Sequence, residues 1–211
     1  MISKEKSEII GLLCAEGCHF VSFSTYYGWD KNRGRYYLRK NKRCERVDFS
    51  NTDKGLSNHF RKLLKKCYGT SPKYTSLKVM IVEQRIVKDL ISYTEYGWDK
   101  WIVPLDIKKG AKRIKIAFIR GLYEGDGTTI FWRGKQPYLE FHMYNLKGLA
   151  EVQTMLSYLN INSELHDNWK KLVIKGNRDV YKFAKIIKPK FKKVIMQGAH
   201  AGVLNALKRS G

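Results

Sequence analysis

The chain has little cysteine, no long apolar run and few acids, and each shortage excludes a class of protein. Its four cysteines all lie in the first third, form no CxxC pair and have no histidine at zinc-finger spacing, so we expect free thiols in a reducing compartment. No apolar run is long enough for a membrane-spanning helix. The first residues contain no apolar signal core, so we expect an intracellular protein of the cytoplasm, nucleoid or an organelle that is not secreted.

Acidic residues are scarce relative to basic ones. In 211 residues, 19 Asp and Glu stand against 41 Lys and Arg, which gives a formal net charge of +22. Because 43% of the residues are hydrophobic, the chain is a globular protein and not a disordered basic tail. The basic residues are spread along the chain, which indicates a long electrostatic face and favours nucleic acid as partner. Solvated helix faces are the plainer alternative, and a membrane surface is not favoured because no segment is both basic and broadly amphipathic.

The chain also contains an internal repeat. Residues 9–17 (IIGLLCAEG) align with residues 119–127 (IRGLYEGDG) at an offset of 110, with four identities and an acid facing an acid. Downstream, Asn51 corresponds to Asn145 at an offset of 94, so the first copy carries an insertion, which we place at the turn-like residues 29–35. The repeats are residues 1–104 and 113–211, with a linker at 105–112 and a C-terminal helical extension from Lys190 to Arg209.

Each copy has the pattern helix, two strands, helix, two strands, helix. Paired strands with short loops between single helices favour an antiparallel α+β fold over parallel βαβ units. Helical periodicity is clear after each strand pair, where apolar residues recur at three and four positions. The sequence therefore predicts two pseudo-symmetric αββαββα repeats.

The repeated nonapeptide places small residues four apart on one helix face. These are Gly11 and Ala15 in the first copy and Gly121 and Gly125 in the second. Small residues at this spacing let two helix backbones approach closely, which offsets the cost of about 0.5–1 kcal/mol for glycine inside a helix. We therefore expect the two repeated helices to pack against each other.

An acid ends each of these helices, Glu16 in the first and Asp126 in the second, and each is followed by a glycine suited to a left-handed cap. If the helices pack side by side, the two carboxylates converge on the pseudo-twofold axis. Both helix C-termini carry negative dipole charge, so a hard divalent cation such as Mg²⁺ would resolve the repulsion. Such a site activates water for phosphodiester hydrolysis. Ordinary exposed helix-end acids are the alternative for a single copy.

These motifs resemble the LAGLIDADG homing endonucleases in their single-chain form with two motif copies, over nearly the whole chain. The resemblance implies two four-stranded antiparallel sheets that form a saddle over double-stranded DNA. It implies a monomer that makes a metal-dependent double-strand break at a long asymmetric target. It further implies two or three Mg²⁺ ions, with Mn²⁺ as a substitute and Ca²⁺ supporting binding without cleavage.

The resemblance also assigns roles to residues. The metal-binding acids are Glu16 and Asp126, and the metal set includes their neighbours Ala15 and Gly125. Asn51 and Asn145 correspond to a polar residue that orders water, and the basic residues of the solvent pocket are Lys108 and Lys193. The neighbours Lys109 and Lys192 are open alternatives for that basic role. The first copy departs from the pattern, since Cys14 replaces an acid and Glu16 is one methylene longer than Asp.

Side chains alternate along a strand, so the DNA face is expected to carry every second residue after the metal acid. Outer hairpins would extend it with lysines. The predicted DNA-binding residues are Ser22, Ser24, Tyr26, Arg46, Asp48, Lys73, Lys78, Trp132, Glu140, His142, Lys170 and Lys171. Absence of splicing-domain features favours an intron-encoded or free-standing enzyme involved in intron homing over an intein. The alternative function is a non-cleaving nucleic-acid-binding protein on the same scaffold, such as an RNA maturase that binds intron RNA.

Overall fold

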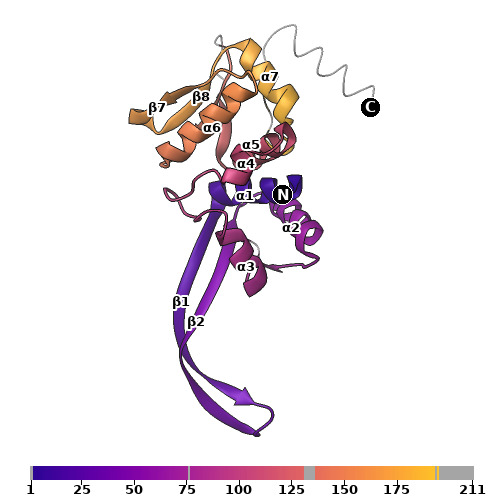
Figure 1. The fold of residues 1–211 in the computed structure, drawn as a ribbon, viewed down its shortest axis with the longest axis vertical. Coiled ribbons are helices and arrows are strands. Elements are labelled where there is room, and N and C mark those ends of the chain that lie inside the picture. Colours follow the sequence, from indigo (N-terminus) through magenta and orange to yellow (C-terminus); the bar gives the residue numbers. More distant parts are fainter. Residues whose placement is uncertain (1, 76, 131–135, 193, 195–211) are drawn as a thin grey trace.

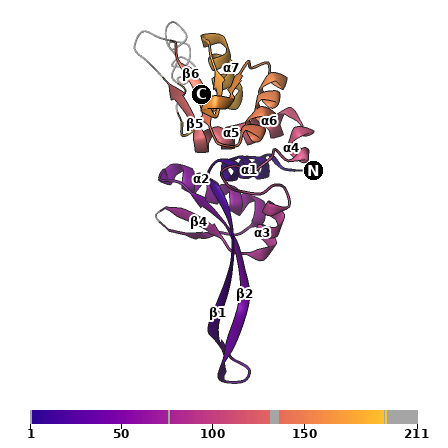
Figure 2. The same ribbon diagram turned by 90° about the vertical axis from the view of Figure 1, so that its left-hand side faces the viewer.

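The computed structural model describes residues 2–75, 77–130, 136–192 and 194, and shows two similar halves. In each half a four-stranded sheet carries helices on one side, and two long helices lie next to each other between the halves (Figure 1, Figure 2). The elements in chain order are α1 (Lys4–Glu16), β1 (Gly17–Asp30), β2 (Arg35–Ser50), α2 (Lys54–Tyr68), β3 (Lys73–Tyr74), β4 (Lys78–Ile81), α3 (Gln84–Ile91), α4 (Leu105–Lys108), α5 (Lys112–Asp126), β5 (Gly127–Ile130), β6 (Tyr138–His142), α6 (Leu146–Tyr158), β7 (Glu164–His166), η1 (Asp167–Trp169), β8 (Lys171–Ile174) and α7 (Asn177–Ile187).

Both sheets have the same strand order, β1-β2-β4-β3 in the first half and β5-β6-β8-β7 in the second, and all neighbours are antiparallel. This confirms the predicted α+β fold of two αββαββα repeats. Apolar residues at alternate positions of the inner strands are fully buried: Val47 and Phe49 of β2 and Leu139 and Phe141 of β6. One face of each sheet therefore packs on helices, and we call the opposite face the open face.

The helices α1 and α5 touch backbone to backbone, as the small residues predicted. A Cβ atom added at Gly11 would lie 2.2 Å from the carbonyl oxygen of Phe118, and one at Gly121 would lie 2.3 Å from that of Glu8. Phe118 and Glu8 are themselves 110 positions apart, so the two contacts are equivalent under the internal repeat. A larger residue at either glycine would force the helices apart.

Equivalent polar residues begin the next helix of each half. Asp53 caps α2, accepting hydrogen bonds from the backbone N–H groups of Gly55 at 2.7 Å and Leu56 at 3.1 Å. Asn145 caps α6, accepting from the N–H of Gly148 at 2.9 Å. Caps of this kind satisfy N–H groups that have no partner within the helix. The caps also fix the first residue of each helix, so Asp53 and Asn145 occupy equivalent positions when the two halves are aligned.

The first hairpin is longer than the sequence predicted. Residues 29–35 were expected to be a turn-like insertion, but β1 and β2 continue through this region, and only residues 31–34 form the turn. Asp30 accepts hydrogen bonds from the N–H groups of Asn32 at 3.0 Å and Arg33 at 3.2 Å, and Gly34 has φ +60°. The insertion is therefore a hairpin extension of β1 and β2, which points away from the second half (Figure 1).

Two further expectations concern the connecting segments. The predicted linker at 105–112 contains the short helix α4. Of the predicted extension from Lys190 to Arg209, only residues 190–192 and 194 are among the described residues. Residues 190–192 follow α7 directly and return to the end of α5, where they contact Glu124.

Candidate functional site

The acids Glu16 and Asp126 are the last residues of α1 and α5, and the packing of these helices brings them together. A Cβ atom added at Gly125 would lie 2.2 Å from the Cβ of Ala15 and 3.1 Å from the Cγ of Glu16. Ala15 and Gly125 thus allow the helix ends to approach closely enough for both carboxylates to share one site. This is the convergence that the repeated motif predicted.

The glycines that follow these acids are required for a different reason than the sequence predicted. Gly17 and Gly127 have φ −90° and −72°, so neither is a left-handed cap. Both lead from the helix straight into an extended strand. A Cβ atom at Gly17 would lie 2.3 Å from the carbonyl oxygen of Leu13, and one at Gly127 would lie 2.0 Å from the ring of Tyr123. Glycine is required here by lack of space and not by a positive φ.

Burial and mutual repulsion perturb the acid pair. Burial raises the pKa of Asp126, and the nearby charge of Glu16 raises it further, to about 7 from an ordinary value of 3.8. Burial also raises the pKa of Glu16, although its carboxylate accepts a hydrogen bond of 2.8 Å from the side-chain amide of Asn51. Neighbouring carboxylates at two helix C-termini favour a cation between them.

Lys192 is the basic residue that the structure places at the acid pair. Its ammonium group donates to the carbonyl oxygen of Gly125 and lowers the pKa of both Glu16 and Asp126 against the effect of burial. Burial in turn lowers the pKa of Lys192. The sequence left Lys192 open as an alternative to Lys193, and Lys193 lies outside the described residues.

Glu124, two residues before Asp126, holds the segment that carries Lys192. Its buried carboxylate accepts backbone hydrogen bonds from Phe191 at 3.1 Å and Lys192 at 2.9 Å, and a further one from Lys190. Glu124 was not among the residues predicted from the sequence. The repeated motif does carry a signal, because the second copy has an acid at this position, two residues before Asp126, and the first copy has Cys14, whose thiol cannot accept several backbone hydrogen bonds.

Lys108 is not where the prediction placed it. It ends α4, and its ammonium group forms an ion pair with Glu151 of α6 at 2.7 Å. The other carboxylate oxygen of Glu151 accepts from the backbone N–H of Val103 at 2.7 Å. These contacts tie the connecting segment to α6, and Lys109 follows as the C-cap residue of α4. Lys108 is therefore not the counterpart of Lys192, and the role of Lys109 stays a prediction.

Asn145 is also not the counterpart of Asn51. Strand register pairs Gly17 with Phe49 and Gly127 with Phe141, so at this point the halves align at an offset of 92 and not 94. The position equivalent to Asn51 is therefore Met143, which is buried. Asn145 instead caps α6 and donates to the carbonyl oxygen of Trp101. Among the described residues, only Asn51 of the two contacts one of the paired acids, Glu16.

Most predicted DNA-binding residues of the first half share the open face of their sheet. Cross-strand partners lie on the same side, and Ser22, Ser24, Tyr26, Arg46 and Asp48 fall on the side opposite the buried Val47 and Phe49. Lys73 and Asp48 both pair with Met80, and Lys78 pairs with Ser50, which brings these lysines to the same face.

In the second half, Glu140, His142 and Lys171 occupy the open face in the same way. Lys170 follows η1 in a left-handed conformation, its ammonium group lies 3.7 Å from the ring centroid of Tyr144, and its contact with DNA stays a prediction. Trp132 lies outside the described residues.

Equivalent acids on the two open faces are already paired with bases. Asp48 and Glu140 lie 92 positions apart and are almost fully buried. Asp48 accepts from Arg46 at 3.1 Å, and Glu140 forms an ion pair with Lys171 at 3.0 Å. Each acid therefore orients a basic side chain at the surface, whereas the sequence predicted that the acids themselves contact DNA.

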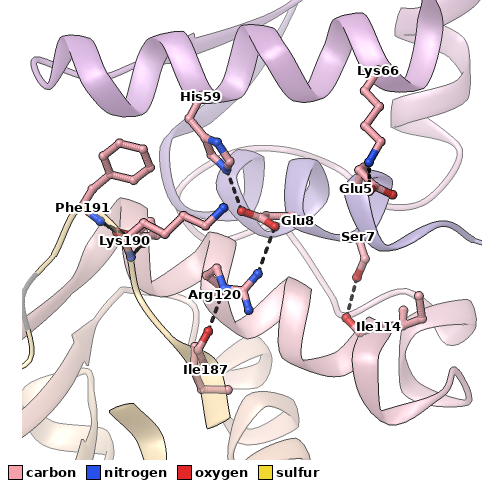
Figure 3. A network of polar contacts seen from close by, with 11 residues as sticks. Glu5, Ser7, Glu8, His59, Lys66, Ile114, Arg120, Ile187, Lys190 and Phe191 are labelled. Atoms are coloured by element: carbon pink, nitrogen blue, oxygen red, sulfur yellow. Dashed lines mark hydrogen bonds and ion pairs between the residues drawn. The ribbon is translucent and has the colours of Figure 1, made fainter. Parts of the chain in front are cut away.

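A buried polar network joins the halves beside the acid pair. Figure 3 shows Glu8 of α1 between His59 of α2, at 2.7 Å, and Arg120 of α5, at 3.4 Å. Arg120 also donates to the carbonyl oxygen of Ile187 at 2.7 Å. The His59 ring in turn packs near that of Phe191, with centroids 5.4 Å apart. The network therefore links both signature helices to the segment that carries Lys192.

The described residues contain no group of three or more His, Cys, Asp and Glu side chains arranged for a metal ion. Within the same residues, no helix combines the length and apolarity that crossing a membrane requires.

Comparison with known proteins supports this architecture. A family model described as LAGLIDADG-like domain matches residues 113–188. Comparison with curated protein sequences gives no significant match.

Among solved structures, a set of mesophilic variants of the homing endonuclease I-DmoI is 19% identical, with a TM-score of 0.57 over 87% of this chain and 95% of that one. I-DmoI in complex with DNA and Mn is 18% identical, with a TM-score of 0.55 over 87% and 96% of the two chains. The N-terminal LAGLIDADG domain of DUF199/WhiA is 19% identical, with a TM-score of 0.54 over 90% and 86%.

At these identities the structural matches show a shared fold. The matched family domain covers the second repeat, and the structural matches span both repeats. Residues 113–188 therefore form a LAGLIDADG-like domain, and the chain as a whole has the two-repeat LAGLIDADG fold.

Proposed function

We propose that this protein is a site-specific DNA endonuclease that makes a metal-dependent double-strand break at a long asymmetric target. The observation that carries the proposal is the convergence of Glu16 and Asp126 at the ends of two packed helices, where burial and the charge of Glu16 together raise the pKa of Asp126 to about 7. Structures of this fold include I-DmoI in complex with DNA and Mn and I-DmoI with its target DNA in the presence of Mg. Because the fold is shared with a domain of WhiA, the fold alone does not assign cleavage.

The residues at the acid pair fit a hard divalent cation. Glu16 and Asp126 supply carboxylate oxygens, which Mg²⁺ prefers, and a cation would relieve the repulsion between them. When bound, Mg²⁺ would lower the pKa of a water nucleophile and stabilise charge on the phosphate oxygens.

The chain's own groups would prepare this site. Asn51 fixes the orientation of the Glu16 carboxylate through its hydrogen bond of 2.8 Å. Lys192 presents a positive charge to both acids from a segment that Glu124 anchors by backbone hydrogen bonds. A partly desolvated ammonium in this place would stabilise negative charge that develops on a phosphate.

The open faces of the two sheets would hold the DNA duplex on either side of the acid pair. They carry Arg46, Lys73, Lys78 and Lys171 in addition to hydrogen-bonding residues. A two-stranded ribbon fits the major groove, where such side chains reach base edges. Both acids belong to one chain, so we propose that the protein acts as a monomer.

The test is cleavage of supercoiled plasmid that carries the DNA junction at which the gene is inserted. We expect linear product with Mg²⁺ or Mn²⁺, and binding without cleavage with Ca²⁺. Asp126→Asn should abolish cleavage and keep binding in Ca²⁺. The control is Asp99→Asn, which changes the same atoms at an exposed position. Unimpaired cutting by Asp126→Asn would refute the role of the acid pair.

A non-cleaving nucleic-acid-binding protein is the second candidate, because the WhiA domain has the same fold. A binder of this kind, such as a maturase that uses intron RNA, has no need for two converging acids. It predicts that both variants and the wild type bind alike and that none of them cuts DNA in Mg²⁺.

A further inference from the structure

The paired acids end two helices that make repeat-equivalent contacts, so Glu16 and Asp126 are related to each other by the internal repeat. The two strands of a DNA duplex are likewise related by a twofold axis. In a complex that aligns the two axes, each acid faces a phosphate of one strand. The groups around each acid then determine how fast that strand is cut.

Asn51 and Met143 occupy equivalent positions beside the two acids. The backbone N–H of Asn51 donates to the carbonyl oxygen of Leu77 at 3.2 Å, and that of Met143 donates to the carbonyl oxygen of Lys170 at 3.0 Å. Each residue also lies two positions beyond a buried phenylalanine of its inner strand. Because side chains alternate along a strand, both side chains lie on the side of the sheet that packs on helices.

These two side chains differ in what they can do for an acid. The amide of Asn51 donates to the carboxylate of Glu16 at 2.8 Å. The thioether of Met143 is buried and has no donor group. Among the described residues, no side-chain hydrogen bond to the carboxylate of Asp126 is formed. The orientation of Glu16 is therefore fixed, and that of Asp126 is not.

The segments that cross between the halves also dock in equivalent ways. A Cβ atom added at Gly55, in the first turn of α2, would lie 3.3 Å from the ring of Phe191. One added at Gly148, in the first turn of α6, would lie 2.4 Å from the ring of Trp101. The chain after α7 thus packs on the first half, and the chain after α3 packs on the second.

The residues that follow these two rings differ in charge. Lys192 follows Phe191, and its ammonium group donates to the carbonyl oxygen of Gly125. Ile102 follows Trp101, and its side chain can neither donate a hydrogen bond nor carry charge. On the first side, the acid pair therefore has an amide and a cation beside it, whereas the equivalent residues on the second side are apolar.

We propose that this protein cuts the two strands of its target in a fixed order and that the strand facing Glu16 is cut first. This rests on the proposed endonuclease function. Asn51 is a positioning residue for the first cut, and Met143 leaves the second cut without one. Partners that orient a metal ligand are worth about 10–100-fold in metal affinity or activity. The first cut should accordingly be at least about tenfold faster than the second, so that nicked duplex accumulates.

Each cut is a hydrolysis that consumes one water molecule. The oxygen of the water bonds to phosphorus, and the bond from phosphorus to one sugar oxygen breaks. The leaving sugar oxygen takes up a proton and becomes a hydroxyl group, and the second proton of the attacking water is released to solvent. The order of the cuts changes neither product and determines only which nicked intermediate is populated.

The first measurement follows both strands of one target duplex that carry different fluorescent labels, under single-turnover conditions in Mg²⁺. Wild-type protein should cut one strand at least about ten times faster than the other. Two further duplexes, each nicked beforehand in one strand, give the rate of each remaining cut alone. Equal rates on the two strands would overturn the proposal.

The second measurement changes the two equivalent side chains separately. Asn51→Leu should slow the cut that is faster in the wild type by at least about tenfold and leave the slower one nearly unchanged. Met143→Gln has the shape of the native side chain, and its extra methylene compared with Asn offsets the shorter Asp126. It should accelerate the slower cut, whereas the matched control Met143→Leu should keep the wild-type ratio of rates.

The ratio of the two rates separates positioning from folding, because a poorly folded variant loses both cuts by the same factor. If Met143→Gln does not fold, Asn51→Leu still decides. Equal slowing of both strands by Asn51→Leu, or slowing of the second cut alone, would refute the assignment.

A third readout does not use cleavage. The electron paramagnetic resonance signal of free Mn²⁺ reports how much of the ion the protein binds. Asn51→Leu should weaken this binding by about tenfold or more, because Asn51 orients the carboxylate of Glu16, and Met143→Leu should leave it unchanged. Unchanged binding by Asn51→Leu would contradict the positioning role.

The outcomes distinguish this proposal from the function on which it rests. If both strands are cut in Mg²⁺ at the same rate, the fixed order fails and the endonuclease stands. If neither strand of the target is cut, the endonuclease fails and the fixed order fails with it.

Discussion

Replacing Asp126 by Asn should stabilise the protein in the absence of divalent metal. The pKa of Asp126 is raised from 3.8 to about 7 by burial and by the charge of Glu16. The folded protein therefore retains a proton that the unfolded chain loses above about pH 4. Its free energy of unfolding must fall as the pH rises through this window, and the loss is complete above the folded-state pKa.

The magnitude follows from the two pKa values. The difference between 3.8 and about 7 corresponds to about 4 kcal/mol at most, at about 1.4 kcal/mol for each pKa unit. About 2 to 3 kcal/mol of this should be lost between pH 5 and pH 8. Asn has a similar shape and no charge, so Asp126→Asn should remove this loss. Other titrating groups largely cancel in the difference between the two proteins.

The assay is urea unfolding with a chelator at a series of pH values, for the wild type, Asp126→Asn and the exposed control Asp99→Asn. We expect the advantage of Asp126→Asn over the wild type to grow from pH 5 to pH 8, and the control to follow the wild type. Saturating Mg²⁺ should raise the stability of the wild type and not that of Asp126→Asn, since a ligand that binds only the folded state stabilises it. A constant difference across the pH range would refute the inferred repulsion between the acids.

Three other predictions follow from the same contacts. Gly121→Ala should destabilise the protein by about 1–3 kcal/mol or more, because its Cβ would meet a backbone carbonyl oxygen, whereas Gly28→Ala, which meets only side-chain atoms at 3.3 Å, should cost less in thermal unfolding. Lys192→Met should slow DNA cleavage in Mg²⁺ by at least about tenfold with little change in binding affinity in Ca²⁺, and equal rates would contradict its role at the acid pair. Glu124→Gln should weaken the anchor of residues 190–192 and slow cleavage in the same direction as Lys192→Met, so a rate unchanged from the wild type would exclude a positioning role.

The sequence predicted the architecture well because the repeat constrains it twice. The motif glycines and the terminal acids Glu16 and Asp126 occur at one offset, and small residues at helical spacing have one obvious use, which is close helix packing. Because side chains alternate along a strand, the sequence also indicated which of them share a face of the sheet. These signals are local, and the fold reproduces them in both halves.

The errors arose where local similarity had two interpretations. Asn51 and Asn145 look equivalent in sequence, but strand register makes Asn145 a helix cap and places Met143 opposite Asn51. The family resemblance assigned Lys108 to the solvent pocket, yet its acidic partner Glu151 lies 43 residues away in the chain and is visible only in three dimensions. The hairpin tip was mistaken for a loop because Gly34 and Asp30 mark a turn without showing how far the strands continue.

The polar link from Glu8 to Arg120 makes the two halves non-exchangeable. Under the internal repeat, Glu8 corresponds to Phe118 and Arg120 corresponds to Ile10. The ion pair between α1 and α5 therefore has no repeat-related counterpart, because the corresponding residues are both apolar. Two copies of the first half would leave Glu8 with His59 alone and without Arg120, and two copies of the second would bury Arg120 without its acid. Breaking a buried pair in this way costs about 3–5 kcal/mol. The ion pair therefore requires two different halves, and a change at Glu8 or Arg120 needs a compensating change in the other half.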